Sequence, residues 1–238
     1  MKNPVLRLAC VAAGLGFSPF AVQALPLLPD VAVGVTAGSA GVGGQLTTSI
    51  IPFLNARVQV QGLSLSHSFD EDGIDYKGKL KLFTGGAFLD VYPFTKVLRL
   101  SGGLVGNGNK VKLKATCQDT CEVGSLQVSG DAATVNGNLG FKDFSPYLGI
   151  GFTNPMAGLP FYFGFDAGVL FHGRPKPSLR ASGTATVTDA GGNTRTDVDL
   201  ATDAEVQAAL AEETANLSDD VKDFKFYPVV QFNLGWRF

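Results

Sequence analysis

Histidine and cysteine are scarce in this chain, and beyond its first residues no long apolar run occurs. There are 2 His and 3 Cys among 238 residues, and the formal net charge is −2. The two cysteines that remain after the first residues have no His nearby, so no metal site is predicted, and the charge balance gives no reason to expect a nucleic-acid partner. The sequence contains neither a phosphate-binding loop nor a dinucleotide fingerprint, so no cofactor is expected.

The first 24 residues have the features of a secretory signal peptide. A basic start precedes an apolar stretch that closes on small residues at Ala21 and Ala24. We therefore expect 1–24 to be removed and 25–238 to form one domain. No later stretch approaches the ~20 apolar residues of a spanning helix. The mature chain is then either soluble beyond the inner membrane or crosses a membrane as a closed sheet.

The C-terminal segment predicts a strand with one apolar face. The residues of that face are Phe224, Phe226, Val230, Phe232, Leu234, Trp236 and Phe238, and the other face has Lys225, Tyr227, Gln231, Asn233 and Arg237. A soluble sandwich could bury such a face, but in a membrane barrel lipid covers it. The pattern resembles the strand by which bacterial outer-membrane proteins are recognised for assembly. That resemblance implies an assembly signal at Phe232, Trp236 and Phe238.

The same alternation recurs along the chain. Counted from the C-terminus, it predicts strands near 224–238, 161–172, 144–153, 97–106, 79–92, 55–66, 42–51 and 31–37. The predicted fold is all-β, a transmembrane antiparallel up-and-down barrel of eight strands. Two further stretches, 184–188 and 194–200, have strand-like composition, so ten strands is the alternative count.

The connections are of two kinds, as in outer-membrane barrels, where short turns are periplasmic. Short ones are predicted at 52–55, 93–96 and 154–160, and longer polar loops at 70–75, 107–136 and 173–223.

Two local features interrupt this pattern. The apolar side changes between Lys79 and Tyr92, and Gly85 and Gly86 predict a β-bulge at the change. The stretch 204–217 has helical composition and follows Asp203, a suitable cap. We predict a short helix before the last strand, either a plug or a surface feature.

The interior of an eight-stranded barrel is about filled by side chains. The charged residues predicted to face it are Arg57, Asp90, Arg99, Asp166, Lys225 and Arg237. One interpretation is that they pair within the wall and close the lumen. The other is that they line a narrow polar path and contact zwitterionic solutes.

Cys117 and Cys121 can form a disulfide in an oxidising compartment, and two free thiols is the alternative.

Ser66, His67 and Ser68 are similar to the Ser and His of barrel lipases and lipid A deacylases. Neighbouring strand residues, however, point to opposite faces. We therefore predict no enzyme, and outer-membrane lipid hydrolysis is the least favoured function.

Several stretches together resemble one family. They are SPYLGIGF, the following FYFGFDAGVLFHGRPKPSL, the early GVTAGSAGVGGQL and the ending YPVVQFNLGWRF. They are similar to the carbapenem-associated, ornithine-uptake type of outer-membrane protein. The resemblance implies an eight-stranded barrel and, for some members, passage of basic amino acids. The pair Cys117 and Cys121 departs from the family pattern.

These observations predict a monomeric protein of a Gram-negative outer membrane. The expected partners are outer-membrane lipid, the barrel-assembly machinery and periplasmic chaperones. The predicted function is a narrow, porin-like channel for small polar solutes such as basic amino acids. The alternative is a non-conducting structural or surface-interaction barrel.

Overall fold

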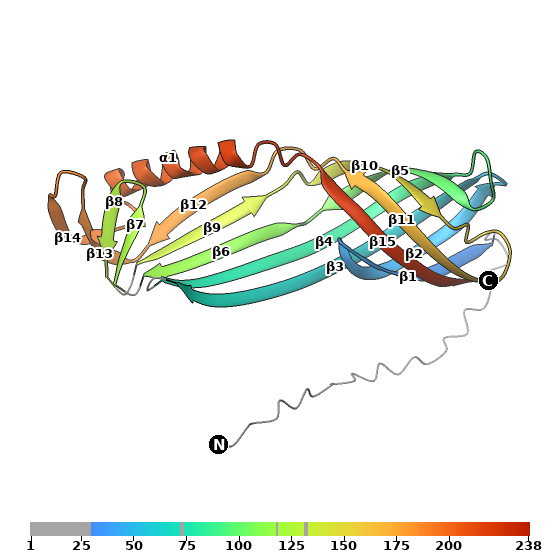
Figure 1. Cartoon of the computed structure of the whole chain (residues 1–238), viewed down its shortest axis with the longest axis horizontal. Helices are drawn as coiled ribbons and strands as arrows, with labels where there is room; N and C mark the ends of the chain where they lie inside the picture. The colour runs from blue at the N-terminus through green and yellow to red at the C-terminus, as the bar shows by residue number, and fades with distance from the viewer. Residues whose placement is uncertain (1–29, 72–73, 118, 131–132) are drawn as a thin grey trace, which may run out of the picture.

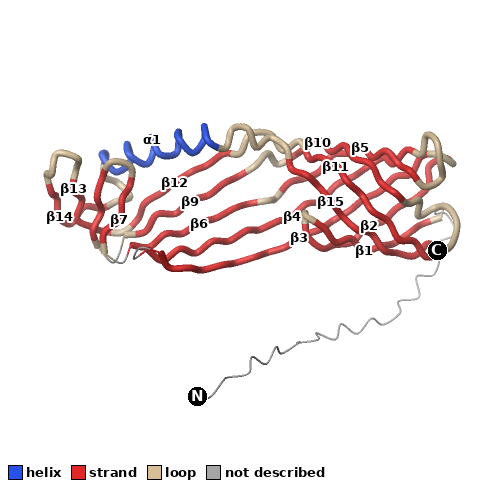
Figure 2. Tube along the Cα trace, in the orientation of Figure 1, coloured by secondary structure: helices blue, strands red, loops and turns tan. Residues whose placement is uncertain are grey.

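The computed structural model describes residues 30–71, 74–117, 119–130 and 133–238. The predicted signal peptide, 1–24, lies outside the described residues. The described chain forms a barrel at one end and an elongated sheet with a helix at the other (Figure 1 and Figure 2).

Eight strands close into a ring. They are β1 (Val31–Gly38), β2 (Gly41–Ile51), β3 (Leu54–Glu71), β4 (Ile74–Val91), β5 (Leu98–Asn107), β10 (Phe144–Phe152), β11 (Phe161–Leu170) and β15 (Tyr227–Arg237). Each pairs antiparallel with the next in this order, and β1 also pairs with β15. The predicted eight-stranded up-and-down barrel is confirmed, and the alternative count of ten is wrong for the ring.

Side chains of the ring alternate between an apolar outside and a polar inside. On β15, Phe232 and Trp236 face outward and are 53% and 49% exposed, whereas Gln231 and Asn233 face inward and are 3% and 1% exposed. A water-soluble protein has the opposite arrangement, and lipid around the barrel accounts for this one. No helix in the described part of the chain is long and apolar enough to cross a membrane.

Glycines inside the barrel make room for two tyrosine rings. Tyr147 on β10 and Tyr162 on β11 are 4% and 5% exposed. A Cβ added at Gly149 or Gly168 would collide with the Tyr147 hydroxyl, and one at Gly34 would collide with that of Tyr162. Inward glycines therefore let large rings fill a narrow lumen at close packing.

Beyond the barrel, one side of its wall continues as a sheet, which we call the extension. β3 and β4 pair over 18 residues each, whereas β2 follows β3 only as far as Gly62. Past that level β4 pairs with β6 (Lys110–Cys117), β6 with β9 (Thr134–Gly140), and β9 with β12 (Lys176–Ser182). β6, β9 and β12 adjoin β5, β10 and β11 in sequence, so each prolongs a strand of the ring.

The predicted β-bulge at Gly85 and Gly86 is wrong. The pairing of β4 with β3 runs unbroken over its whole length, and no shift occurs in its pairing with β5. The apolar side changes because the surroundings of the strand change. Within the barrel Leu89 faces outward, where lipid would cover it. Within the extension Leu80 lies on the inner face, and lysines occupy the outer one.

The long polar loops predicted at 107–136 and 173–223 are mostly folded, so that prediction is wrong. They supply β6, β9 and β12 and a separate sheet of β7 (Thr120–Val123), β8 (Leu126–Ser129), β13 (Thr184–Thr188) and β14 (Thr194–Asp199). Two of these strands are the stretches that the ten-strand alternative had assigned to the barrel.

Helix α1 (Ala204–Asp220) follows β14 and confirms the helix predicted at 204–217. The carboxylate of Asp203 caps it by accepting a hydrogen bond from the backbone N–H of Val206. The helix contacts β12 and β7, so it is a surface feature and does not plug the barrel. We call α1 and the sheet β7–β8–β13–β14 the cap.

The cap and the end of the extension share one apolar core. Val206 and Leu210 of α1 pack with Val128 and Val187 of the small sheet, and all four are at most 3% exposed. The residues of this core are Cys117, Cys121, Val123, Leu126, Val128, Ala133, Ala181, Ala185, Val187, Val198, Leu200, Val206, Ala209 and Leu210. Cys117 at the end of β6 and Cys121 in β7 are joined by a disulfide, with Cα atoms 5.9 Å apart. The bond links the extension to the cap.

Candidate functional site: the barrel interior

Four charged side chains lie inside the barrel. They are Arg57 on β3, Asp90 on β4, Arg99 on β5 and Asp166 on β11, and each is at most 2% exposed. All four occupy inward positions of their strands, as the alternation predicts. Their burial means that each needs a partner, because an isolated charge in a low-dielectric interior is very unfavourable.

The four groups form a chain in which positive and negative charges alternate. Arg57 binds Asp90 through two hydrogen bonds, Nε to Oδ2 at 2.8 Å and Nη2 to Oδ1 at 3.1 Å. Arg99 donates from Nη2 to Oδ2 of Asp166 at 2.6 Å and from Nε to Oδ1 at 3.1 Å. Nη1 of Arg99 is 3.6 Å from Oδ2 of Asp90, which connects the two pairs. With two arginines and two aspartates, the cluster carries no net charge.

A glycine on the intervening strand allows the second pair to form. β10 separates β5 from β11, and Gly151 lies opposite both Arg99 and Asp166 in the register. A Cβ added at Gly151 would collide with the Asp166 carboxylate and with the Arg99 side chain. The absent side chain therefore opens the space in which the guanidinium reaches the carboxylate across β10.

Uncharged inward side chains add further hydrogen bonds to the cluster. Ser101 donates to Asp90 at 2.6 Å, and Gln231 and Asn233 of β15 both donate to Asp166. Arg57 also donates from Nη1 to Gln59 at 2.6 Å. Each carboxylate thus accepts from an arginine and from at least one neutral donor, the arrangement that compensates a buried ion pair most fully.

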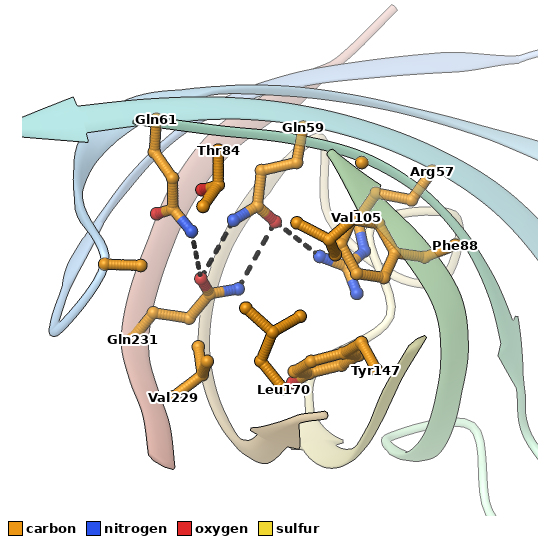
Figure 3. A pocket seen from close by; sticks show the side chains of 12 residues that line it. Arg57, Gln59, Gln61, Thr84, Phe88, Val105, Tyr147, Leu170, Val229 and Gln231 are labelled. Carbon is orange, nitrogen blue, oxygen red and sulfur yellow. Dashed lines mark hydrogen bonds between the residues drawn. The ribbon is translucent and has the colours of Figure 1, made fainter. Parts of the chain in front are cut away.

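On the side towards the extension, the lumen is filled by a further layer of side chains (Figure 3). Gln231 exchanges hydrogen bonds with Gln59 and accepts one from Gln61. The Arg57 guanidinium lies over the Phe88 ring, 4.4 Å from its centroid. The cavity among these residues has a volume of about 20 Å³. That is room for about one water molecule, so an amino acid does not fit in this cavity.

Hydrogen bonds also connect side chains of different strands and turns at the opposite end of the barrel, where the short turns lie. Asn55 donates to the Tyr92 hydroxyl and to the side-chain oxygen of Asn154, and Tyr92 donates to the backbone oxygen of Thr153. Arg237 donates to backbone oxygens of the turn between β10 and β11.

Two of the predicted inward charges lie outside the cluster. Lys225 precedes β15, its side chain is 40% exposed, and its nearest acidic partner is Asp223 at 4.0 Å. Lys225 is therefore not a lumen residue, because the strand begins only at Tyr227. Arg237 keeps the inward position but lies at the turn end, where it binds the carbonyls of Met156 and Gly158.

Sequence reasoning missed the neutral partners of the cluster. Gln59, Ser101, Gln231 and Asn233 are at most 4% exposed, and each bonds directly to Arg57, Asp90 or Asp166. Their inward position could be read from strand alternation. Which cross-strand neighbour each one meets depends on the register, and the register was not available from the sequence.

The other predicted residues are placed as follows. Phe232, Trp236 and Phe238 face outward near the turn end of β15 and are 53%, 49% and 70% exposed. His67 lies on the extension part of β3, and alternation puts Ser66 and Ser68 on the opposite face of that strand. No group of His, Cys, Asp and Glu that could hold a metal ion occurs among the described residues.

Comparison with known structures shows a likeness in fold. No family model and no curated protein matches this sequence. The crystal structure of CarO2 of Acinetobacter baumannii matches over 89% of this chain and 99% of that one, with a TM-score of 0.56 and 19% identity. CarO of the same organism matches over 87% and 97%, with a TM-score of 0.52 and 20% identity. CarO is the carbapenem-associated outer membrane protein, so the resemblance stated from the sequence is confirmed at the level of the fold.

Proposed function

We propose that this protein is a monomeric outer membrane barrel with a sealed lumen, and that its function lies in the folded extension and cap outside the membrane. The observation that carries the proposal is the buried chain Arg57–Asp90–Arg99–Asp166. Ion pairs link each residue of this chain to the next, and its net charge is zero. A conducting pore keeps a hydrated path, whereas here the cavity lined by Arg57, Gln59 and Gln231 has a volume of about 20 Å³.

The location follows from the surface of the barrel. Its apolar outward face requires lipid, and in outer membrane barrels the short turns are periplasmic. This orientation places the extension and the cap on the outer side of the membrane. The aromatic residues Phe232, Trp236 and Phe238 support recognition of β15 by the barrel-assembly machinery after periplasmic chaperones have delivered the chain.

A narrow channel for basic amino acids is the second candidate. In its favour, acidic and basic groups meet inside the barrel, where both ends of a zwitterion could be bound. Against it, the solute would have to displace Arg99 from Asp166, and truncating one partner of such a pair costs roughly 3–5 kcal/mol. An enzyme is not proposed, because Ser66 and Ser68 lie across β3 from His67.

Single-channel recording in planar bilayers tests the proposal. We expect the wild-type barrel to show no conductance with or without ornithine or lysine. A variant with alanine at Arg57, Asp90, Arg99 and Asp166 and also at Gln59, Gln61 and Gln231 should conduct, because both sets of side chains that fill the lumen are then truncated. Leu148→Ala, on the outward face, is the matched control and should remain silent. A small wild-type conductance that responds to basic amino acids would instead establish the channel.

A further inference from the structure

The outer face of the extension is strongly basic, and we propose that it binds phosphate groups of glycolipids in the outer leaflet of the outer membrane. The residues of this basic face are Lys77, Lys79, Lys81, Lys110, Lys112, Lys114, Lys176 and Arg180, all of them exposed. The inference rests on the proposed function, since it requires the extension to lie on the outer side of the membrane.

The register brings six of these lysines together in pairs. Directly opposite each other on β4 and β6 are Lys81 and Lys110, Lys79 and Lys112, and Lys77 and Lys114. Directly opposed Cβ atoms lie ~4.5–5.5 Å apart, and like charges at such positions repel each other. Three successive repulsive pairs oppose folding of the extension. A polyanion bound across the pairs would turn this repulsion into attraction.

The remaining strands of the extension extend the same chemistry. Asn136 and Asn138 on β9 lie opposite Lys114 and Lys112, and Arg180 on β12 lies opposite Asn136. Amide and guanidinium groups donate hydrogen bonds to phosphate oxygens, and Arg can do so bidentately. Residues of β4, β6, β9 and β12 line a groove of about 580 Å³ on this face.

Acidic side chains are absent from the described positions of these rows. The nearest acidic residue on the outer face of β4 is Asp75, beyond the last lysine pair. Within the described chain, no salt bridge includes any of the eight basic residues. These eight are part of a total of 19 Lys and Arg in a chain of net charge −2, so positive charge is segregated on one face.

The position of the basic face selects a lipid as the source of the phosphate. Phe83 is the last outward apolar residue of β4 and is 53% exposed, and Lys81 is the next outward residue. At ~3.4 Å per residue, Lys81 lies ~7 Å and Lys77 ~20 Å beyond Phe83 along the strand. The lysines therefore begin where the apolar belt ends, which is the level of lipid head groups. Basic clusters next to a membrane surface are attracted to anionic lipids.

The test measures binding of purified bisphosphorylated lipid A to the folded protein in neutral detergent. The basic-face variant carries Lys79→Gln, Lys112→Gln and Lys114→Gln, and the matched control carries Lys96→Gln, Lys142→Gln and Lys222→Gln. Near an anionic surface each basic residue contributes roughly a fivefold factor in affinity. We therefore expect about a hundredfold weaker binding for the basic-face variant and less than a twofold change for the control. Heat-modifiable gel mobility verifies that both variants are folded.

Two further ligands separate the sources of phosphate. Dephosphorylated lipid A should bind wild type and basic-face variant equally weakly, and inorganic pyrophosphate should compete with lipid A only at much higher concentration. Equal affinity of the wild type and both variants for lipid A would overturn the proposal. Competition by pyrophosphate or an oligonucleotide at the concentration of lipid A would overturn the lipid assignment. The conductance experiment is independent of lipid binding. A wild type that conducts but still binds lipid A more tightly than the basic-face variant does would refute only the sealed lumen.

Discussion

Breaking the pair Arg99–Asp166 should show that the interior charges stabilise the barrel as a unit. We consider Arg99→Met, Asp166→Leu and the double variant. Each single change leaves a buried charge without its partner, at a cost of about 3–5 kcal/mol. Asp166→Leu should lie at the upper end of this range, because Gln231 and Asn233 also lose their acceptor.

The double variant should be much less destabilised than the sum of the single variants. It removes one positive and one negative charge, and the remaining pair Arg57–Asp90 is neutral and keeps both of its hydrogen bonds. We expect a coupling energy of at least about 2 kcal/mol between the two substitutions, as is typical for residues of one buried network. Replacing both residues of a buried ion pair by apolar residues often changes the free energy of unfolding little.

Urea titration of folding into lipid vesicles measures these free energies. The single tryptophan, Trp236, faces outward on β15, so its fluorescence reports entry of the strand into lipid. If the double variant loses as much unfolding free energy as the two single variants together, Arg99 and Asp166 act independently, and the network is refuted. Outward Leu148→Ala again provides the control for a substitution on a neighbouring strand.

The remaining predictions concern packing and the cap. Gly168→Val should reduce the folded yield because its side chain would collide with Tyr147, and adding Tyr147→Ala should restore part of it on heat-modifiable gels. Asp203→Ala should destabilise α1 by about 1 kcal/mol through loss of the cap, measured as faster amide exchange in the helix. Hydrogen bonding to Arg195 lowers the pKa of Asp203 to about 2, so its contribution should persist above pH 4 and disappear as the pH falls through about 2, read by circular dichroism. Reducing the disulfide Cys117–Cys121 should weaken the cap by about 2 kcal/mol and leave the barrel closed, as amide exchange in the two regions would show.

The eight barrel strands could be predicted because lipid imposes one rule on all of them. Outward residues must be apolar and inward ones small or polar, so alternation alone locates a strand such as β15. The same rule identified Arg57, Asp90, Arg99 and Asp166 as inward charges. It did not give their pairing, because Gly151, which lets Arg99 reach Asp166, has no side chain by which the sequence could reveal its role.

The rule fails where the lipid ends. In the extension the outer face of β4 carries lysines and the inner face carries leucines. The switch of the apolar side that suggested a bulge therefore marks the point where the surroundings of the strand change from lipid to water. The cap strands are only 4 to 6 residues long and are rich in threonine and polar residues, which makes them similar to loops in sequence. Their stability comes from side chains that meet only in three dimensions, such as Val128 with Val187 and Leu210.

Closure of the ring has a consequence for the order of folding. The closing pair joins distant parts of the chain, with Ala32 opposite Arg237. Contacts between residues so far apart in sequence form late, because the entropy lost on closing the loop must be overcome before the strand pairing stabilises the fold. Until β15 is in place, β1 and β11 each expose backbone N–H and C=O groups that lipid cannot satisfy. A half-built barrel is therefore not a stable membrane species, and insertion and closure must occur as a single event that requires β15.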